Sequence, residues 1–355
     1  MTLAVAVLLA GIVVPAASLA QALTYPGEAI TPVRLVEWVR EHGGSGIVDL
    51  VENWWYARPP AASDPKPADL PAPPTAAALG APPALPLPAG VTPLPGEGEW
   101  VAGALSSGGG PAIYTTFERP DSRYPSAVAG VALLESGLTA TRLIAGTREP
   151  GLQPWPEGAR VPDALRGSLV ATFNSGFKMQ DAHGGFVADG RTAVPLRDGA
   201  ASLVVRRDGT ATVAQWGRDA VAGPDVVAVR QNLDLVVDGG RPVVGLDGNN
   251  GLRWGSTKNQ LQYTWRSGIG VDAVGNLIYV AGTGMNLVTL AAALVQAGAV
   301  RGMQLDIHSQ MVDFFSYRHA GSGEPTATRL LPTMPGGLDR YLVADQRDFV
   351  AVTLR

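Results

Sequence analysis

The sequence predicts a mixed α/β (α+β) protein, with one large, mostly antiparallel sheet and a few packed helices in a single catalytic-type domain. Two hairpins are the first reason. Residues 201–215 form two β-prone runs that turn at Asp208-Gly209, and residues 268–281 form two more that turn at Gly275-Asn276. Dipeptides of this kind between apolar runs are typical of short antiparallel connections.

A strand–helix–strand segment is the second reason. Asn286 is a suitable N-cap for a helix that runs to about Ala297, and a glycine follows the expected end. This helix would join the strand at 277–281 to the strand at 303–307. Further β-prone runs cover 112–117, 127–134, 168–173, 233–237, 311–317 and 341–353.

Composition excludes several classes of function. The formal net charge of the 355 residues is -4 and only 16% of them are charged, so we expect no nucleic-acid partner. The absence of cysteine excludes disulfides, thiolate metal sites and cysteine nucleophiles. The four histidines, at 42, 183, 308 and 319, form no paired-histidine zinc motif. A divalent cation (Ca or Mg) held by carboxylate and amide oxygens stays open.

The N-terminus predicts export. Leu3 to Ala20 is almost wholly apolar and uncharged and ends in small residues, although no basic residue precedes it. Residues 1–22 are therefore interpreted as a signal peptide or a membrane anchor, and the pattern does not separate the two. The expected location is extracytoplasmic, either secreted or membrane-anchored.

The rest of the chain divides by composition. Residues 23–58 show helical spacing with a break at Gly43-Gly44, which predicts a membrane-proximal helical segment. Residues 59–95 are rich in proline and alanine and predict an extended linker. Residues 96–355 then form the globular domain.

The strand at 303–307 supplies the first candidate site residues. Apolar residues alternate here with Gln304, Asp306 and His308, so the three polar side chains are expected on one face of a core strand. Buried carboxylates and imidazoles are costly without partners, and such a face usually lines a cavity. The alternative is an edge strand with a solvated face.

Two more segments combine a strand end with polar residues and glycine. Asn174, Gly176 and Lys178 follow the strand at 168–173 and could approach a ligand, although a plain turn has the same composition. Arg266 lies at the start of the strand at 268, where its guanidinium suits a phosphate or carboxylate. The alternative for Arg266 is an ion pair with a surface carboxylate.

Other side chains are weaker candidates. Asp238 ends a predicted strand and could be a second carboxylate for acid–base work beside Asp306, although Asp-Gly pairs are often simple turns. Trp265 adjoins Arg266, and strand alternation predicts that it points to the opposite side and packs in the core. Three other tryptophans could stack on sugars but more often fill cores: Trp155, Trp216 and Trp254.

Taken in order, three of these segments resemble the phosphodiester glycosidase family over roughly residues 112–355. The matching segments are Asn174-Ser-Gly-Phe177, Arg266-Ser-Gly-Ile-Gly270 and Leu305-Asp-Ile-His-Ser309. The family has a run of glycines after the aspartate, and this chain has Ile307-His308 instead.

The resemblance implies an exported hydrolase that breaks the anomeric C–O bond of sugar-1-phosphodiesters in cell-envelope glycans. It implies that Arg266 neutralises the phosphate leaving group, while Asp306 acts as a base or stabilises the oxocarbenium-like centre. His308 would donate a proton or hydrogen bond. Asn174 would position the sugar or phosphate, and Lys178 would add positive charge.

Two further interpretations stay open. The altered glycine run favours a non-catalytic glycan-binding protein that retains the pocket. A metal-dependent esterase built on Asp306 and neighbouring carboxylates would lose activity with a chelator. Partners in every case are an envelope glycan or sugar phosphodiester and, through the N-terminal segment, a membrane.

Overall fold

The computed structural model describes residues 16–24, 31–76, 78, 80–88, 90–248, 253–255, 259–319 and 325–355. The chain forms two compact units, residues 1–55 and residues 56–355. Residues 1–15, which carry most of the predicted signal or anchor, lie outside the described part. Within that part, no helix is long and apolar enough to cross a membrane.

The first unit is helical. A helix covers 16–24, α2 covers Thr31–Val39, η1 covers Arg40–Gly44 and α3 covers Ser45–Tyr56. The two helices expected around the glycine pair are present, and Gly43 breaks the helical path with a φ of 86°. Hydrogen bonds from Trp38 Nε1 to Ser18 Oγ (3.1 Å) and from Arg34 to the Leu23 carbonyl (3.2 Å) join the helix 16–24 to α2.

The second unit begins with the proline-rich segment, for which the sequence predicts an extended linker. Its residues pack along the domain: the guanidinium of Arg119 donates to Asp64 (2.9 Å), and the amide of Leu85 donates to the Gly98 carbonyl (3.0 Å). Leu85 is buried. Apart from η2 (Pro67–Asp69) the described part of 59–95 contains no regular element, yet apolar side chains such as Leu85 still hold it to the domain.

The described strands form three antiparallel sheets, which confirms the predicted class but divides the single expected sheet. The first has the order β1 (Val101–Ala102), β2 (Ile113–Glu118), β3 (Ala129–Leu134), β14 (Leu277–Met285), β13 (Thr264–Val271), β15 (Arg301–Ile307), β11 (Leu235–Asp238) and β12 (Arg241–Pro242). The second has the order β7 (Arg191–Val194), β6 (Phe186–Ala188), β10 (Val226–Gln231), β8 (Ala201–Arg206) and β9 (Ala211–Gln215). The third has the order β17 (Thr326–Arg329), β16 (Phe314–Arg318), β5 (Leu169–Asn174), β18 (Phe349–Leu354) and β4 (Thr139–Ile144). Strongly twisted sheets rarely grow beyond about ten strands without splitting into packed sheets.

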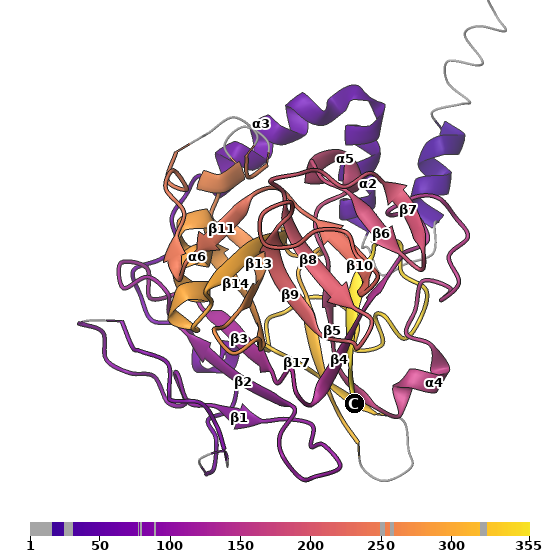
Figure 1. Ribbon diagram of the computed structural model, residues 1–355. Helices are drawn as coiled ribbons and strands as arrows, with labels where there is room; N and C mark the ends of the chain where they lie inside the picture. Colours follow the sequence, from indigo (N-terminus) through magenta and orange to yellow (C-terminus); the bar gives the residue numbers. More distant parts are fainter. Residues whose placement is uncertain are drawn as a thin grey trace, which may run out of the picture. The chain divides into compact units, whose positions relative to one another are not determined.

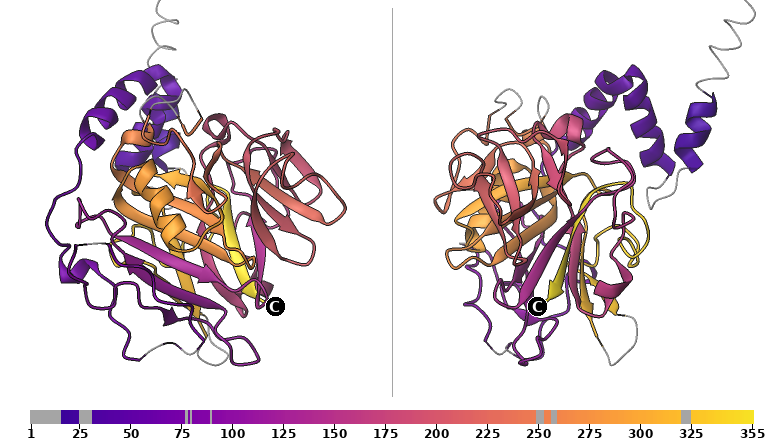
Figure 2. Two further views of the ribbon diagram at one scale, coloured as in Figure 1. Left: turned by 60° about the vertical axis from the view of Figure 1, so that its left-hand side comes forward. Right: turned by 45° about the vertical axis from the view of Figure 1, so that its right-hand side comes forward.

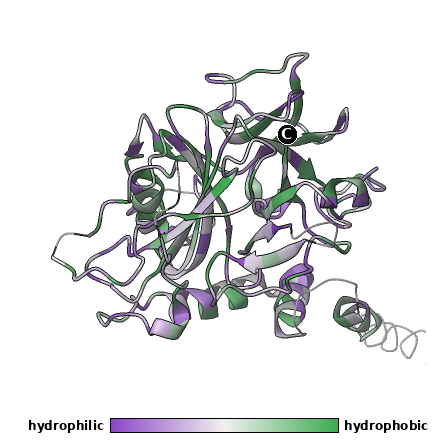
Figure 3. Ribbon diagram, turned by 90° about the horizontal axis from the view of Figure 1, so that it is seen from below, coloured by the Kyte–Doolittle hydropathy of each residue, from purple (hydrophilic) through white to green (hydrophobic). Residues whose placement is uncertain are grey.

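One hydrophobic core joins the three sheets. It contains Phe117 and Met303 from the first sheet, Leu203 from the second, and Phe173 and Val350 from the third. Figures 1 and 2 show the three groups of strands around this interior. The strands next to the C-terminus are coloured mainly as hydrophobic in Figure 3, as expected for strands buried on both faces.

Helix α6 (Leu287–Gln296) covers the outer face of the first sheet (Figure 2). Leu290 and Leu294 pack there with Val236 and Ile278. The Asn286 side chain caps the helix by accepting from the Thr289 amide (2.9 Å), as predicted. Strands β14 and β15 flank β13 and both run antiparallel to it, so the predicted strand–helix–strand crossover is present. The remaining short helices are α4 (Asp163–Arg166), α5 (Met179–Ala182) and η3 (Asn259–Leu261).

Candidate functional site

A bulge in the β13–β15 pairing separates the side chains of Gln304 and Asp306, which were expected on one face of the strand. The register shifts between Arg266 and Gly268 of β13. Gln304 Oε1 accepts a hydrogen bond from Arg266 Nη1 (2.6 Å), whereas Asp306 Oδ2 accepts one from Arg347 Nη2 (2.8 Å). The prediction of one shared polar face is therefore wrong for Gln304, because the extra residue of the bulge reverses the alternation.

Asp306 is a nearly buried carboxylate with one charged partner. The residue is 7% exposed, and its Oδ1 accepts from the Ile307 amide (2.8 Å). Burial raises the pKa of Asp306 to about 6, while the charge of Arg347 and the hydrogen bond from the Ile307 amide act in the opposite direction. A carboxylate that titrates close to neutral pH can take up a proton during a reaction.

Arg347, which the sequence analysis missed, connects Asp306 to the turn after β5. It precedes β18, its side chain is 14% exposed, and Nη2 also donates to the Gly176 carbonyl (2.9 Å). No local motif marks an arginine at this position. The pair forms only because the fold brings β18 beside the turn after β5 and the end of β15.

Gly176 has a steric role in this arrangement. A Cβ atom at this position would lie 2.8 Å from Asn232 Cγ. The Asn232 side chain accepts from the Phe177 amide (3.1 Å) and donates to the carbonyls of Gln304 and Leu305 (both 2.9 Å). Gly176 therefore lets Asn232 hold the turn against β15. Lys178 lies further along the same turn, partly exposed, at the N-terminal end of α5.

Asn174 occupies the centre of a buried polar network. Its Nδ2 donates to Ser267 Oγ (2.9 Å) and its Oδ1 accepts from the Tyr279 hydroxyl (2.8 Å) and the Asp313 amide (3.2 Å). Ser267 Oγ in turn accepts from the Asp306 amide (3.2 Å). Asn174 thus positions the strand that carries Asp306, and both polar atoms of its side chain are engaged inside the protein.

Arg266 is also held inside the protein. It is fully buried, and it donates to the carbonyls of Met285 (3.0 Å) and Gln262 (3.1 Å) besides Gln304. Burial lowers the pKa of Arg266 to about 9. The predicted contact between Arg266 and a substrate phosphate conflicts with this position, because no face of the guanidinium reaches the surface.

Asp238 lies too far from Asp306 to act with it. Asp238 is paired in register with Arg301, at the opposite end of β15. Five residues of extended strand separate Arg301 from Asp306, which corresponds to about 16 Å. Asp238 instead forms an ion pair with Arg218 (2.7 Å). The prediction of a carboxylate pair is therefore wrong.

His308 lies in the turn after β15. Its φ is 73°, a conformation that glycine adopts more readily. Its amide donates to the Trp265 carbonyl (2.9 Å), and its Nδ1 lies 3.2 Å from Thr264 Oγ1. The ring lies 5.1 Å from that of Tyr56, between centroids.

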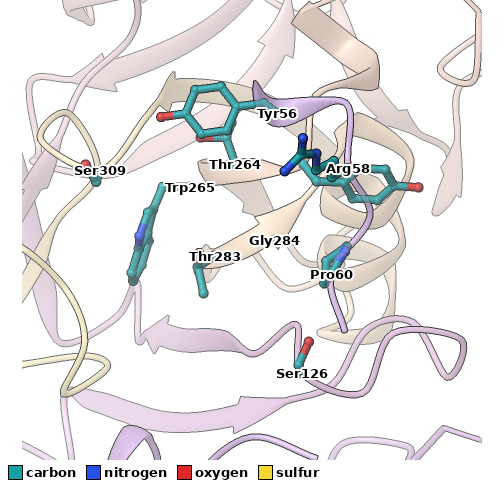
Figure 4. A pocket seen from close by; sticks show the side chains of 10 residues that line it. Tyr56, Arg58, Pro60, Ser126, Thr264, Trp265, Thr283, Gly284 and Ser309 are labelled. Atoms are coloured by element: carbon teal, nitrogen blue, oxygen red, sulfur yellow. The ribbon is translucent and has the colours of Figure 1, made fainter. Parts of the chain in front are cut away.

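A cavity of about 290 Å³ lies at the start of β13 and the end of β14, next to Ser309 (Figure 4). Its wall combines aromatic rings, hydroxyls and a cation: Tyr56, Arg58, Pro60, Ser126, Tyr263, Thr264, Trp265, Thr283, Gly284 and Ser309. Trp265 was expected wholly in the core; it is partly buried against the core and also lines this cavity. Trp155, Trp216 and Trp254 are buried.

Metal ligands are not clustered in this region. Among the residues that the structure describes, no group of three or more His, Asp or Glu side chains is placed to hold an ion.

Comparison with known proteins gives one family. A family model described as phosphodiester glycosidase matches residues 164–331. Residues 164–331 resemble the phosphodiester glycosidase family. This match confirms the resemblance predicted from the three segments, and it includes Asn174, Arg266, Asp306 and His308 but ends before Arg347. No curated protein matches the chain.

Solved structures give weaker likenesses. The catalytic domain of zebrafish N-acetylglucosamine-1-phosphodiester alpha-N-acetylglucosaminidase is 15% identical, with a TM-score of 0.46, and the match covers 72% of this chain and 88% of that domain. A hypothetical protein from Synechocystis is also 15% identical, with a TM-score of 0.37, and the match covers 69% of this chain and 62% of that one. These values are too low to carry an argument about the site.

Proposed function

We propose that the protein is an exported hydrolase that cleaves the glycosidic bond of sugar-1-phosphodiesters in cell-envelope glycans. One observation carries the proposal. Asp306 lies within the segment that matches the family model, and it combines near-complete burial, a pKa of about 6 and an arginine partner at 2.8 Å. Such perturbed carboxyl groups are typical of catalytic sites.

The chemistry requires a base and a cation. Water attacks the anomeric carbon, the bond from that carbon to the phosphate oxygen breaks, and the phosphate monoester leaves as an anion. Ionised Asp306 accepts the proton of the attacking water and later releases it to solvent. We assign the stabilisation of the phosphate leaving group to Arg347 instead of the buried Arg266. The Arg347 side chain is partly exposed and adjoins Asp306.

In this proposal the cavity binds the sugar; Asp306 and Arg347 are not among its lining residues, so the proposal requires that the scissile bond extend from the cavity to them. Trp265 and Tyr263 offer aromatic faces for a sugar ring, and the hydroxyls of Thr264 and Thr283 can bond its substituents. His308 contacts Thr264 and precedes Ser309, two residues of the cavity wall, and its ring would form a hydrogen bond with the bound sugar. Arg58 adds positive charge to the wall, as an anionic substrate needs.

The test is direct. The purified full chain would be incubated with aryl and alkyl phosphodiesters of N-acetylglucosamine and other sugars, and free reducing sugar would be measured. We expect release by the wild type, loss of release in Asp306→Asn and no effect of a chelator. Loss of activity with the chelator would favour a metal-dependent esterase instead.

A second function has its own support. Asn174, Arg266 and Gln304, three of the predicted site residues, are buried and occupied by internal hydrogen bonds. This favours an envelope glycan-binding protein that keeps the cavity without turnover. Binding of sugar phosphodiesters that depends on Trp265 but yields no reducing sugar would support it.

Export remains part of the proposal. It depends on the apolar, uncharged sequence from Leu3 to Ala20. Fractionation of cells that produce the full chain would test it, since the protein should be recovered in the envelope or the medium.

A further inference from the structure

Helix α3 carries an exposed apolar stripe. Five of its side chains, at spacings of three and four residues, are each between 54% and 72% exposed: Ile47, Leu50, Val51, Trp54 and Trp55. This spacing places them on one side of a helix. Scattered exposed apolar residues are ordinary, but a continuous stripe of five large ones marks an interaction surface.

Two polar side chains of α3, those of Glu52 and Asn53, are less exposed than the stripe. Glu52 forms an ion pair with Arg40, and its side chain is 20% exposed, far less than the apolar stripe. A surface helix of a water-soluble protein normally buries its apolar side and exposes its charges. In the helical unit this order is reversed, so the apolar stripe of α3 faces outwards from the helices of its own unit.

We propose that the apolar stripe of α3 lies in the interfacial region of a lipid bilayer. The first argument is its place in the chain. The uncharged run from Leu3 to Ala20 leads into the helix 16–24, which is hydrogen-bonded to α2 through Ser18 and Leu23. Because α2 and α3 follow in the same compact unit, a membrane that holds the N-terminal run is within reach of the stripe.

The second argument is the chemistry of the stripe. Its C-terminal end is the adjacent pair Trp54 and Trp55, whose ring centroids are 6.2 Å apart. Tryptophan is enriched at the boundary between lipid tails and headgroups, where one part of the ring is apolar and another is wet. The stripe contains aliphatic residues next to this pair, as an interfacial helix does.

Charge decides which bilayer is expected. Between residues 31 and 55 the sequence contains two arginines and four carboxylates, so the unit has no basic face for anionic headgroups. Burial of apolar side chains is therefore the driving force. The proposal expects association with neutral phosphatidylcholine that is insensitive to salt, and it does not depend on the proposed hydrolase activity.

The chain offers a clean test because it contains no cysteine. Val51→Cys and, separately, Leu50→Cys in the full chain would each be labelled with an environment-sensitive fluorophore. Val244→Cys is the matched control, since this valine is 90% exposed in the second unit. Phosphatidylcholine vesicles, with and without phosphatidylglycerol, would be added at low and high salt.

We expect emission from the labels at 50 and 51 to shift to the blue with both vesicle types at either salt concentration, and emission from the label at 244 to stay unchanged. Labels at 50 and 51 that stay in water while the protein sediments with vesicles would overturn the proposal. A blue shift without vesicles, together with a doubled mass in solution, would also overturn it and assign the stripe to a second copy of the chain. The two stripe positions keep the test decisive if one variant does not fold.

Discussion

Replacement of Arg347 by methionine should move the titration of Asp306 to higher pH. The Arg347 guanidinium lies 2.8 Å from the carboxylate and lowers its pKa, while burial raises it to the resulting value of about 6. An opposite charge at this distance typically changes a carboxyl pKa by about 1–3 units. Without it, the pKa of Asp306 should rise to about 7–9. Methionine keeps most of the apolar stem, so packing changes little.

The electrostatic part of the stability cost of the same change is limited. With a pKa of about 6, the ionised form of Asp306 at pH 7 is favoured over the protonated form by about 1.4 kcal/mol. In Arg347→Met the carboxyl can take up a proton instead, so the loss of charge should destabilise the folded protein by no more than about this amount. At pH 5 both proteins have Asp306 protonated, and this part of the difference should vanish.

The assay is the pH dependence of kcat/KM, which reports the free enzyme. Wild type should show a rising limb near pH 6, and Arg347→Met a limb displaced to higher pH with a lower plateau, because the phosphate loses its cation. Arg142→Met removes a surface arginine paired with Glu157 at 3.3 Å and serves as the control. A limb that stays near pH 6 in Arg347→Met would refute the assignment of Asp306 as the base.

Three further predictions use other contacts. Gly176→Ala should destabilise the protein by about 1–3 kcal/mol in urea unfolding, because the new methyl group would meet Asn232. The control Gly167→Ala should not destabilise it, since no atom lies within 4 Å of the added methyl group. Equal stability of the two variants would contradict the steric role of Gly176. Trp265→Ala should raise KM at least about tenfold, since a lost contact of about 1.5 kcal/mol has this effect, while the pH dependence of kcat/KM stays unchanged. An unchanged KM would show that the cavity is not part of the substrate site. Between pH 4 and pH 7, wild type should lose up to about 3 kcal/mol of stability relative to Asp306→Asn. The reason is that folding raises the pKa of Asp306 from 3.8 to about 6, so the folded state holds the proton more tightly than the unfolded state. A stability difference that does not change with pH would show that the pKa of Asp306 is ordinary.

Local signals were sufficient for much of the fold. The hairpin of β8 and β9 turns at Asp208-Gly209, and α6 begins after the Asn286 cap, as turn and capping preferences predict. The division into three sheets could not be predicted, because it depends on which strands pair over long sequence separations. The contacts between the proline-rich segment and the domain could not be predicted for a similar reason: the composition of the segment lacks periodicity, and these contacts are tertiary.

The site shows the same limit. Asp306 stood out because a carboxylate in an apolar strand is costly, and the structure places it where its pKa is perturbed. The bulge that separates it from Gln304 has no sequence signature here, and Arg347 lies 41 residues further along the chain. Asp238 and Arg266 were plausible by residue type alone. Their actual partners, Arg218 and buried carbonyls, are known only from the fold.

The central claim is that Asp306 performs the hydrolysis of a sugar-1-phosphodiester. The most direct measurement is the rate of reducing-sugar release from an aryl phosphodiester of N-acetylglucosamine, and from a panel of other sugars, by wild type and by Asp306→Asn at pH 7. The account predicts release by wild type on at least one sugar and a rate at least about 100-fold lower for the variant, as expected for loss of a general base. Equal rates for the two proteins, or release by neither on any sugar of the panel, would contradict it.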